Sequence, residues 1–180
     1  MTRLEVAQAG SAGLADTAAM TALMWTDTLA LRQPSMDDTH REFVERLNAL
    51  GAARGAGLAQ LRRALDDFVA HTEDHFAQED AWLARLGFAA ESCHGLQHRQ
   101  VLEVVHEVQR RFSADAAEAR LVDELVPALA QWFPVHALTM DAGLAHAMAE
   151  SGLDPDSGRL EHAPDAAAAP RTGCGSAACG

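Results

Sequence analysis

The stretch LAQLRRALDDFVAHTEDHFAQEDAWLARL, residues 58–86, places its apolar residues at alternating steps of three and four. Such steps return to one face of an α-helix and are typical of a helix that packs in a bundle. Gly87 follows the last apolar residue and predicts the end of the helix. The residues on this inward face are Leu58, Leu61, Leu65, Phe68, Thr72, His75, Glu79, Trp82 and Leu86.

Three other segments have the same period. One follows His40 and continues to residue 50, and either Asp37 or Ser35 can cap its start. The others cover residues 94–112 and 121–140. Because the sequence lacks strand-like alternation, we predict an all-α fold, an antiparallel up-down four-helix bundle.

The two ends of the chain differ from this middle part in composition. Residues 1–19 are mostly small or polar and indicate a flexible N-terminal arm. Residues 151–180 contain three of the six prolines together with Cys174 and Cys179, and they indicate a disordered tail rather than a redox or metal clip. The bundle is therefore expected over residues 20–150.

Charge and composition exclude several classes of function. The formal net charge of −12 argues against nucleic acid or an anionic membrane as a partner. No stretch approaches the roughly 20 apolar residues that cross a bilayer, and the N-terminal residues lack the apolar run of a signal peptide. Three cysteines do not make a disulfide framework. We expect a cytoplasmic protein.

Several side chains that can bind metal lie on the predicted inward faces. They are His40, His75, Glu79, His94, His98 and His136. Buried imidazoles and carboxylates without partners are expensive, and a shared metal site would satisfy them together. Imidazoles with carboxylates suit iron, zinc, manganese or copper. Their number exceeds the four ligands of a tetrahedral zinc, which favours two metal ions.

The order of these motifs resembles the hemerythrin family, and in particular the bacterial hemerythrin-like domains. The matching motifs are Trp25 in the N-terminal arm, DDTH at 37–40, HFAQE at 75–79, HGLQH at 94–98 and WFPVHALTMD at 132–141. The resemblance covers about residues 20–150.

The resemblance implies a non-haem di-iron centre whose two ions share an oxo or hydroxo bridge. One iron would be held by His94, His98 and His136. The other would be held by His40 and His75 and would keep an open coordination position. Glu79 and Asp141 would bridge the two ions. The aromatic residues expected to wall the pocket are Trp25, Phe43, Phe76, Trp82 and Trp132.

The function implied by the resemblance is reversible O2 binding for storage, delivery or sensing, with a protein or redox partner that the sequence does not identify. We expect an oxygen-binding protein rather than an enzyme. Two alternatives remain open: a di-iron oxidoreductase that acts on O2, peroxide or nitric oxide, and an iron-handling protein.

Three features of the sequence complicate this assignment. Asp141 follows His136 by five residues, about 140° around an ideal helix, so it should flank the site, and its role as a ligand rests on the resemblance. Pro127 and Pro134 are expected to bend the fourth helix. His71 lies one residue off the inward face, and we expect it near the site without binding metal.

Overall fold

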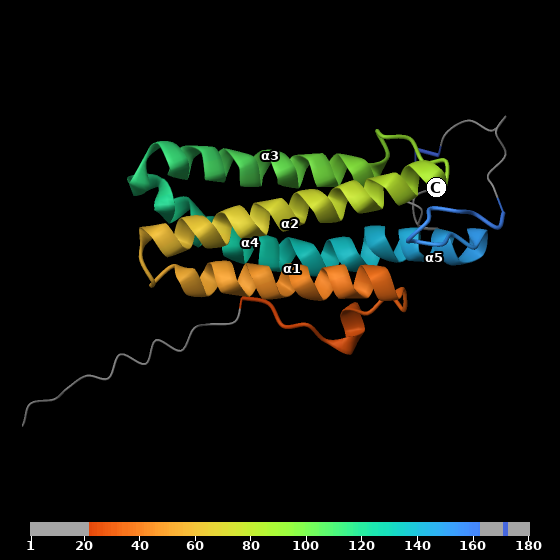
Figure 1. The fold of residues 1–180 in the computed structure, drawn as a ribbon, viewed down its shortest axis with the longest axis horizontal. Coiled ribbons are helices and arrows are strands. Elements are labelled where there is room, and N and C mark those ends of the chain that lie inside the picture. The colour runs from red at the N-terminus through yellow and green to blue at the C-terminus, as the bar shows by residue number, and fades with distance from the viewer. Residues whose placement is uncertain (1–21, 163–170, 173–180) are drawn as a thin grey trace, which may run out of the picture.

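The structure is a computed structural model that describes residues 22–162 and 171–172. Four long helices lie side by side and each packs against two neighbours (Figure 1). They are α1 (Pro34–Ala53), α2 (Leu58–Arg85), α3 (Cys93–Ala114) and α4 (Arg120–His136). Shorter elements are η1 (Asp27–Leu29), η2 (Ala116–Ala119), η3 (Ala137–Asp141) and α5 (Ala142–Ser151). The all-α four-helix bundle is confirmed.

The start of α1 differs from the prediction. Pro34 occupies the first turn, where its missing N–H is harmless, and the side chain of Gln33 accepts a hydrogen bond from the Met36 N–H. The helix therefore begins before both predicted caps. Asp37 instead accepts a hydrogen bond from the Leu31 N–H at 2.7 Å, which ties the preceding segment to the helix.

The bundle has two apolar clusters. The larger one fills the space between the four long helices, from Leu50 and Leu61 at one end to Phe76 and Phe133. The smaller one lies at the opposite end, where Trp82 of α2 and Leu86, which follows α2, meet Leu144 and Met148 of α5. The inward faces of α1 and α2 pass through both clusters, and the polar residues discussed below lie between them.

Residues 151–162 pack on the bundle, whereas composition assigned them to the tail. Leu153 is buried in the smaller cluster, Leu160 packs against that cluster, and Trp82 Nε1–H donates to the Pro155 carbonyl at 3.1 Å. The Glu161 and His162 N–H groups also donate to the Ser151 carbonyl, so that apolar and backbone contacts hold the segment together. The predicted arm at residues 1–19, Cys174 and Cys179 lie outside the described residues.

The end of α4 is irregular. The helix continues through Pro127 and Pro134 to His136, and the next five residues form the π-helical turn η3. In this turn the Ala142 N–H donates to the Ala137 carbonyl, five residues back. A widened turn thus follows the second proline, whereas the bend expected from the two prolines stays a prediction. Among the described residues, no helix is long and apolar enough to cross a membrane.

Candidate metal centre

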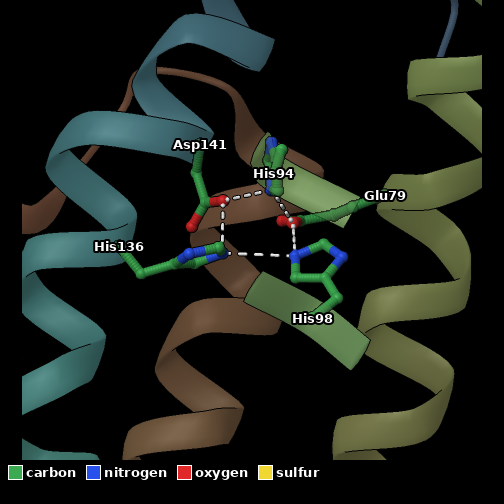
Figure 2. Close-up of side chains that lie close together, drawn as sticks. All are labelled: Glu79, His94, His98, His136 and Asp141. Atoms are coloured by element: carbon green, nitrogen blue, oxygen red, sulfur yellow. Dashed lines mark hydrogen bonds and ion pairs between the residues drawn. The ribbon is translucent and has the colours of Figure 1, made fainter. Parts of the chain in front are cut away.

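All seven predicted ligands meet inside the bundle, and each side chain is buried. Their ligand atoms form two groups, within each of which every atom lies within 4.8 Å of the others. The larger group, drawn in Figure 2, contains Glu79, His94, His98, His136 and Asp141. The smaller group contains His40, His75 and Glu79. Glu79 belongs to both.

Glu79 divides its two carboxylate oxygens between the groups. Oε1 lies 3.1 Å from His75 Nε2 and 3.4 Å from His40 Nε2. Oε2 lies 3.3 Å from the Nε2 atoms of both His94 and His98. The carboxylate therefore stands between two sets of imidazoles and faces each with one oxygen.

Asp141 divides its oxygens in the same way. Oδ1 lies 3.0 Å from His94 Nε2 and 3.1 Å from His136 Nε2, whereas Oδ2 lies 3.2 Å from His40 Nε2. Asp141 was expected to flank the site, but the π turn carries it fully into the interior.

Several of these atoms lack partners in hydrogen-bonding geometry. Glu79 Oε2, both oxygens of Asp141 and His94 Nε2 are buried without such a partner among the described residues. Each unsatisfied buried polar atom costs about 1–3 kcal/mol. Atoms that crowd together without hydrogen-bonding one another are the arrangement expected of ligands around cations. The residues present therefore fit a metal.

The charges of the two carboxylates suit the same role. Burial raises the pKa of Glu79, but the charge of His75 and the contacts with His40 outweigh it, so that the pKa lies well below its usual range. Burial and the charge of Glu79 raise the pKa of Asp141, and the imidazole of His136 again reverses the shift. Both carboxylates are ionised, which is the form that binds metal.

His40 and His94 hold protons in the absence of a cation. Burial lowers the pKa of His40, but contacts with Asp141 and Glu79 outweigh it and raise the pKa to about 10. The same balance raises the pKa of His94 to about 9. For His136, burial prevails and its pKa is lowered. A metal ion would take the place of these protons.

Two outer partners were missed in the sequence. Asp80 Oδ1 lies 2.9 Å from His98 Nδ1, and Gln97 Oε1 lies 2.9 Å from His136 Nδ1. A carboxylate can only accept, so His98 carries a proton on Nδ1 and points Nε2, the atom that would bind a metal, towards the centre. Each partner stands next to a ligand in the sequence, but no periodic signal marks such a position.

Aromatic rings surround the imidazoles, and four of the five predicted ones do so. Phe76 stacks on His98 with 4.1 Å between ring centroids, and Trp132 stacks on His136 at 4.4 Å. The other two predicted rings stand beside His40 and His75, which we call the two-histidine side of the centre. The ring centroid of Phe43 lies 6.1 Å from that of His75, and the ring centroid of Trp25 lies 6.5 Å from that of His40.

The aromatic wall differs from the prediction at two positions. Trp82 packs with Met36 and Leu144 in the smaller apolar cluster, because it stands one helical layer beyond Glu79 towards the end of the bundle. Phe133 was missed. Its ring meets His40 edge-on at 5.2 Å and stacks on Phe43 at 4.4 Å.

His71 lies beside the centre and outside both ligand groups. Its ring centroid is 6.0 Å from that of His75, and its Nδ1 is 3.6 Å from Glu42 Oε2 on α1. Its position agrees with the expectation of a neighbour of the site.

Comparisons with known proteins identify relatives over most of the chain. A family model described as the hemerythrin HHE cation binding domain matches residues 34–147. A bacteriohemerythrin of Ralstonia nicotianae is 38% identical over 135 residues, which cover 75% of this chain and 95% of that protein. One from Pseudomonas aeruginosa is 29% identical over 144 residues, covering 77% and 92%. No solved structure matches the chain significantly.

Proposed function

The chain belongs to the hemerythrin family, and on that premise we propose that it holds two iron ions and binds O2 reversibly, for storage, delivery or sensing. The buried cluster of imidazoles and carboxylates supports a metal site. The family supports iron as the metal.

The observation that carries the proposal is the way Glu79 and Asp141 divide their oxygens between two unequal sets of imidazoles. His94, His98 and His136 stand on one side, and only His40 and His75 stand on the other. Two ions bridged by both carboxylates would use every one of these ligand atoms. The two-histidine side has one protein ligand fewer and leaves a coordination position for a small molecule, as open metal sites do.

The surroundings of the two-histidine side favour O2 over water or anions. Phe43 and Phe133 are fully buried, stack on each other and stand next to His75 and His40. An apolar wall excludes water, which favours a small uncharged ligand and slows its conversion by polar attack.

The chemistry divides between the metal and the chain. Two ferrous ions, when bound, supply the two electrons that O2 accepts and recover them on its release. The chain holds the imidazoles in place: Asp80 and Gln97 fix the orientation of His98 and His136 from outside, and Phe76 and Trp132 pack against the same rings.

A redox enzyme acting on O2, peroxide or nitric oxide would need a proton donor near the two-histidine side. His71 is the nearest imidazole outside the ligand set. Burial, with the charges of His75 and Arg46, lowers its pKa to about 4. His71 is therefore neutral at pH 7 and donates a proton poorly, which favours binding over turnover.

Metal analysis and optical spectra test the proposal. The chain is loaded with Fe²⁺ under nitrogen, the iron per chain is measured, and air is admitted and then removed. We expect two irons per chain and an absorption band that appears with O2 and disappears on its removal. Fewer than two irons would refute the dinuclear centre, and an irreversible band with peroxide consumed would favour the enzyme.

A further inference from the structure

Residues 22–31, which precede α1, run alongside that helix (Figure 1). The first few of them form no helix or strand, so their backbone N–H and C=O groups need partners elsewhere. Asn48 of α1 supplies partners for three of these groups. Its Oδ1 accepts from the Ala22 and Leu23 N–H groups at 2.8 and 3.1 Å, and its Nδ2 donates to the Leu23 carbonyl at 2.7 Å. A single side-chain amide thus attaches the start of the segment to α1.

Asp37 attaches the other end of the segment 22–31 to the same helix. Its Oδ1 accepts from the Leu31 N–H at 2.7 Å. Asp37 and Asn48 stand about three helical turns, or roughly 16 Å, apart on α1. The segment is therefore held at both ends, and the position of the residues between them depends on these two side chains.

Trp25 lies between the two attachments, next to one of the predicted metal ligands. Its ring centroid is 6.5 Å from that of His40, and the side chain packs, partly buried, against the larger apolar cluster. The exposed guanidinium of Arg41 lies over the same indole, with Cζ 5.0 Å from the ring centroid. Trp25 therefore stands close both to the two-histidine side and to a solvent-exposed charge.

The outer nitrogen of His40 differs from those of two other ligands. His40 Nε2 faces Glu79 and Asp141, whereas Nδ1 is buried without a hydrogen-bond partner among the described residues. His98 and His136 each have an outer acceptor at 2.9 Å. When His40 binds a metal through Nε2, its Nδ1 carries a proton to which any entering water would bond. Packing, rather than an outer hydrogen bond, must therefore hold this imidazole and keep water from it.

We propose that Asn48 is a positioning residue of the centre, whose three hydrogen bonds hold the segment 22–31 on α1 so that Trp25 covers His40 and excludes water from the two-histidine side. Asn48 belongs to neither ligand group and acts through Trp25. Without its amide, the start of the segment opens more easily, because fewer hydrogen bonds oppose local opening. The effect on bound O2 rests on the proposed function, whereas the attachment of the segment does not.

The first experiment measures amide hydrogen exchange by mass spectrometry in the full-length chain loaded with Fe²⁺ under nitrogen. Asn48→Ala removes all three hydrogen bonds, whereas Asn48→Asp keeps an oxygen that accepts from the two N–H groups. The matched control, Gln109→Ala, removes one side-chain amide bond between α3 and Asp66 of α2. We expect residues 22–31 to exchange at least about 10-fold faster in Asn48→Ala, at an intermediate rate in Asn48→Asp and at the native rate in the control. Native exchange in Asn48→Ala would overturn the proposal.

The second experiment follows the decay of the oxygenated band in Asn48→Ala, Trp25→Leu and the double variant. We expect each single variant to decay about 10-fold faster than the native chain, and Gln109→Ala to decay at the native rate. The double variant should decay no faster than Trp25→Leu, because a residue that acts through Trp25 has no effect once that ring is removed.

Two results would overturn the positioning role and leave the O2 proposal standing. One is native decay in Asn48→Ala despite faster exchange of the segment, and the other is a double variant whose decay combines the full effects of both single variants. A native chain without a reversible band would instead overturn the proposed function. Hydrogen exchange would still decide whether Asn48 holds the segment 22–31 on α1.

Discussion

Asp141 Oδ1 lies 3.1 Å from His136 Nε2, although Asp141 follows His136 by five positions along the chain. On an ideal α-helix they would point about 140° apart. The π turn between them widens the helix, closed by the hydrogen bond from the Ala142 N–H to the Ala137 carbonyl. Both side chains consequently face the same interior, and α5 continues the helix beyond them. Single π turns of this kind often mark functional sites.

The widened turn makes a prediction about spacing. Deleting the exposed Thr139 shortens the spacing between the imidazole and the carboxylate from five to four, which an ordinary α-helix also places on one face. We expect this variant to keep its full iron content. Inserting one alanine after Thr139 makes the spacing six, about 120° off that face at roughly 100° per residue. Chelator competition should show the insertion weakening iron binding at least about 10-fold; native affinity in that variant would mean that Asp141 is dispensable.

His75 and His71 make a second prediction, since they lie one turn apart on α2 but only His75 belongs to a ligand group. We expect His75→Ala to lose one iron per chain and His71→Ala to keep both at equilibrium. Iron analysis after exhaustive loading measures this directly. A loss of iron in the His71 variant alone would reverse the assignment.

The inward face of α2 shows how much of the fold can be predicted from the periodicity of apolar residues in the sequence. Steps of three and four place Thr72, His75 and Glu79 in the interior, because helix geometry is local and independent of the rest of the fold. Leu58 has the same period but is 49% exposed, because it begins the helix at the edge of the bundle. Periodicity gives a face, and the neighbouring helices decide how far along the helix that face is covered.

Other parts of the site depend on contacts that a sequence does not display. Phe133 rather than Trp132 fills the interior next to His40, because the orientation of α4 is set by packing against α1. Asp80 is 46% exposed and has no pattern to mark it as a partner of His98. The π turn depends on how the fourth helix continues into α5, so the position of Asp141 could be inferred from the family resemblance and not from spacing.

The contact between Asp80 and His98 leads to a third prediction. The carboxylate orients the imidazole and raises its basicity, and loss of such an outer partner commonly weakens metal binding about 10–100-fold. We expect this loss in Asp80→Ala and a partial recovery in Asp80→Asn, whose amide oxygen still accepts from Nδ1–H. The control is Glu73→Ala, which breaks a similar pair with His106 at the surface. Equal iron affinity in Asp80→Ala and the control would contradict the role.

A fourth prediction concerns the pH dependence of the metal-free chain. The pKa values of His40 and His94 are about 10 and about 9 in the folded state, against 6.5 for a free imidazole. The stability they contribute is fully present below pH 6.5 and is lost as the pH rises towards 9 and 10, because the folded state then binds more protons than the unfolded one. Urea unfolding at pH 6, 8 and 10 spans this window in steps of about 2 units. The free energy of unfolding should fall from each of these pH values to the next. The iron-loaded chain should lack this fall, since its imidazoles bind metal without those protons; a flat profile without metal would refute the assignment.

The last prediction concerns Phe133, because its ring both packs in the apolar core and helps to keep water away from the site. Phe133→Leu removes the ring that stands edge-on to His40 and leaves space that water can enter. Phe112→Leu is the matched control, since Phe112 is also buried in the larger cluster but has no ring contact with a ligand histidine among the described residues. Both variants should lose about 0.5–3 kcal/mol in the free energy of unfolding. Only Phe133→Leu should speed the decay of the oxygenated band, because polar access promotes that decay. Equal decay rates in the two variants at matched stability would show that the aromatic wall supports the fold and not the lifetime of the bound ligand.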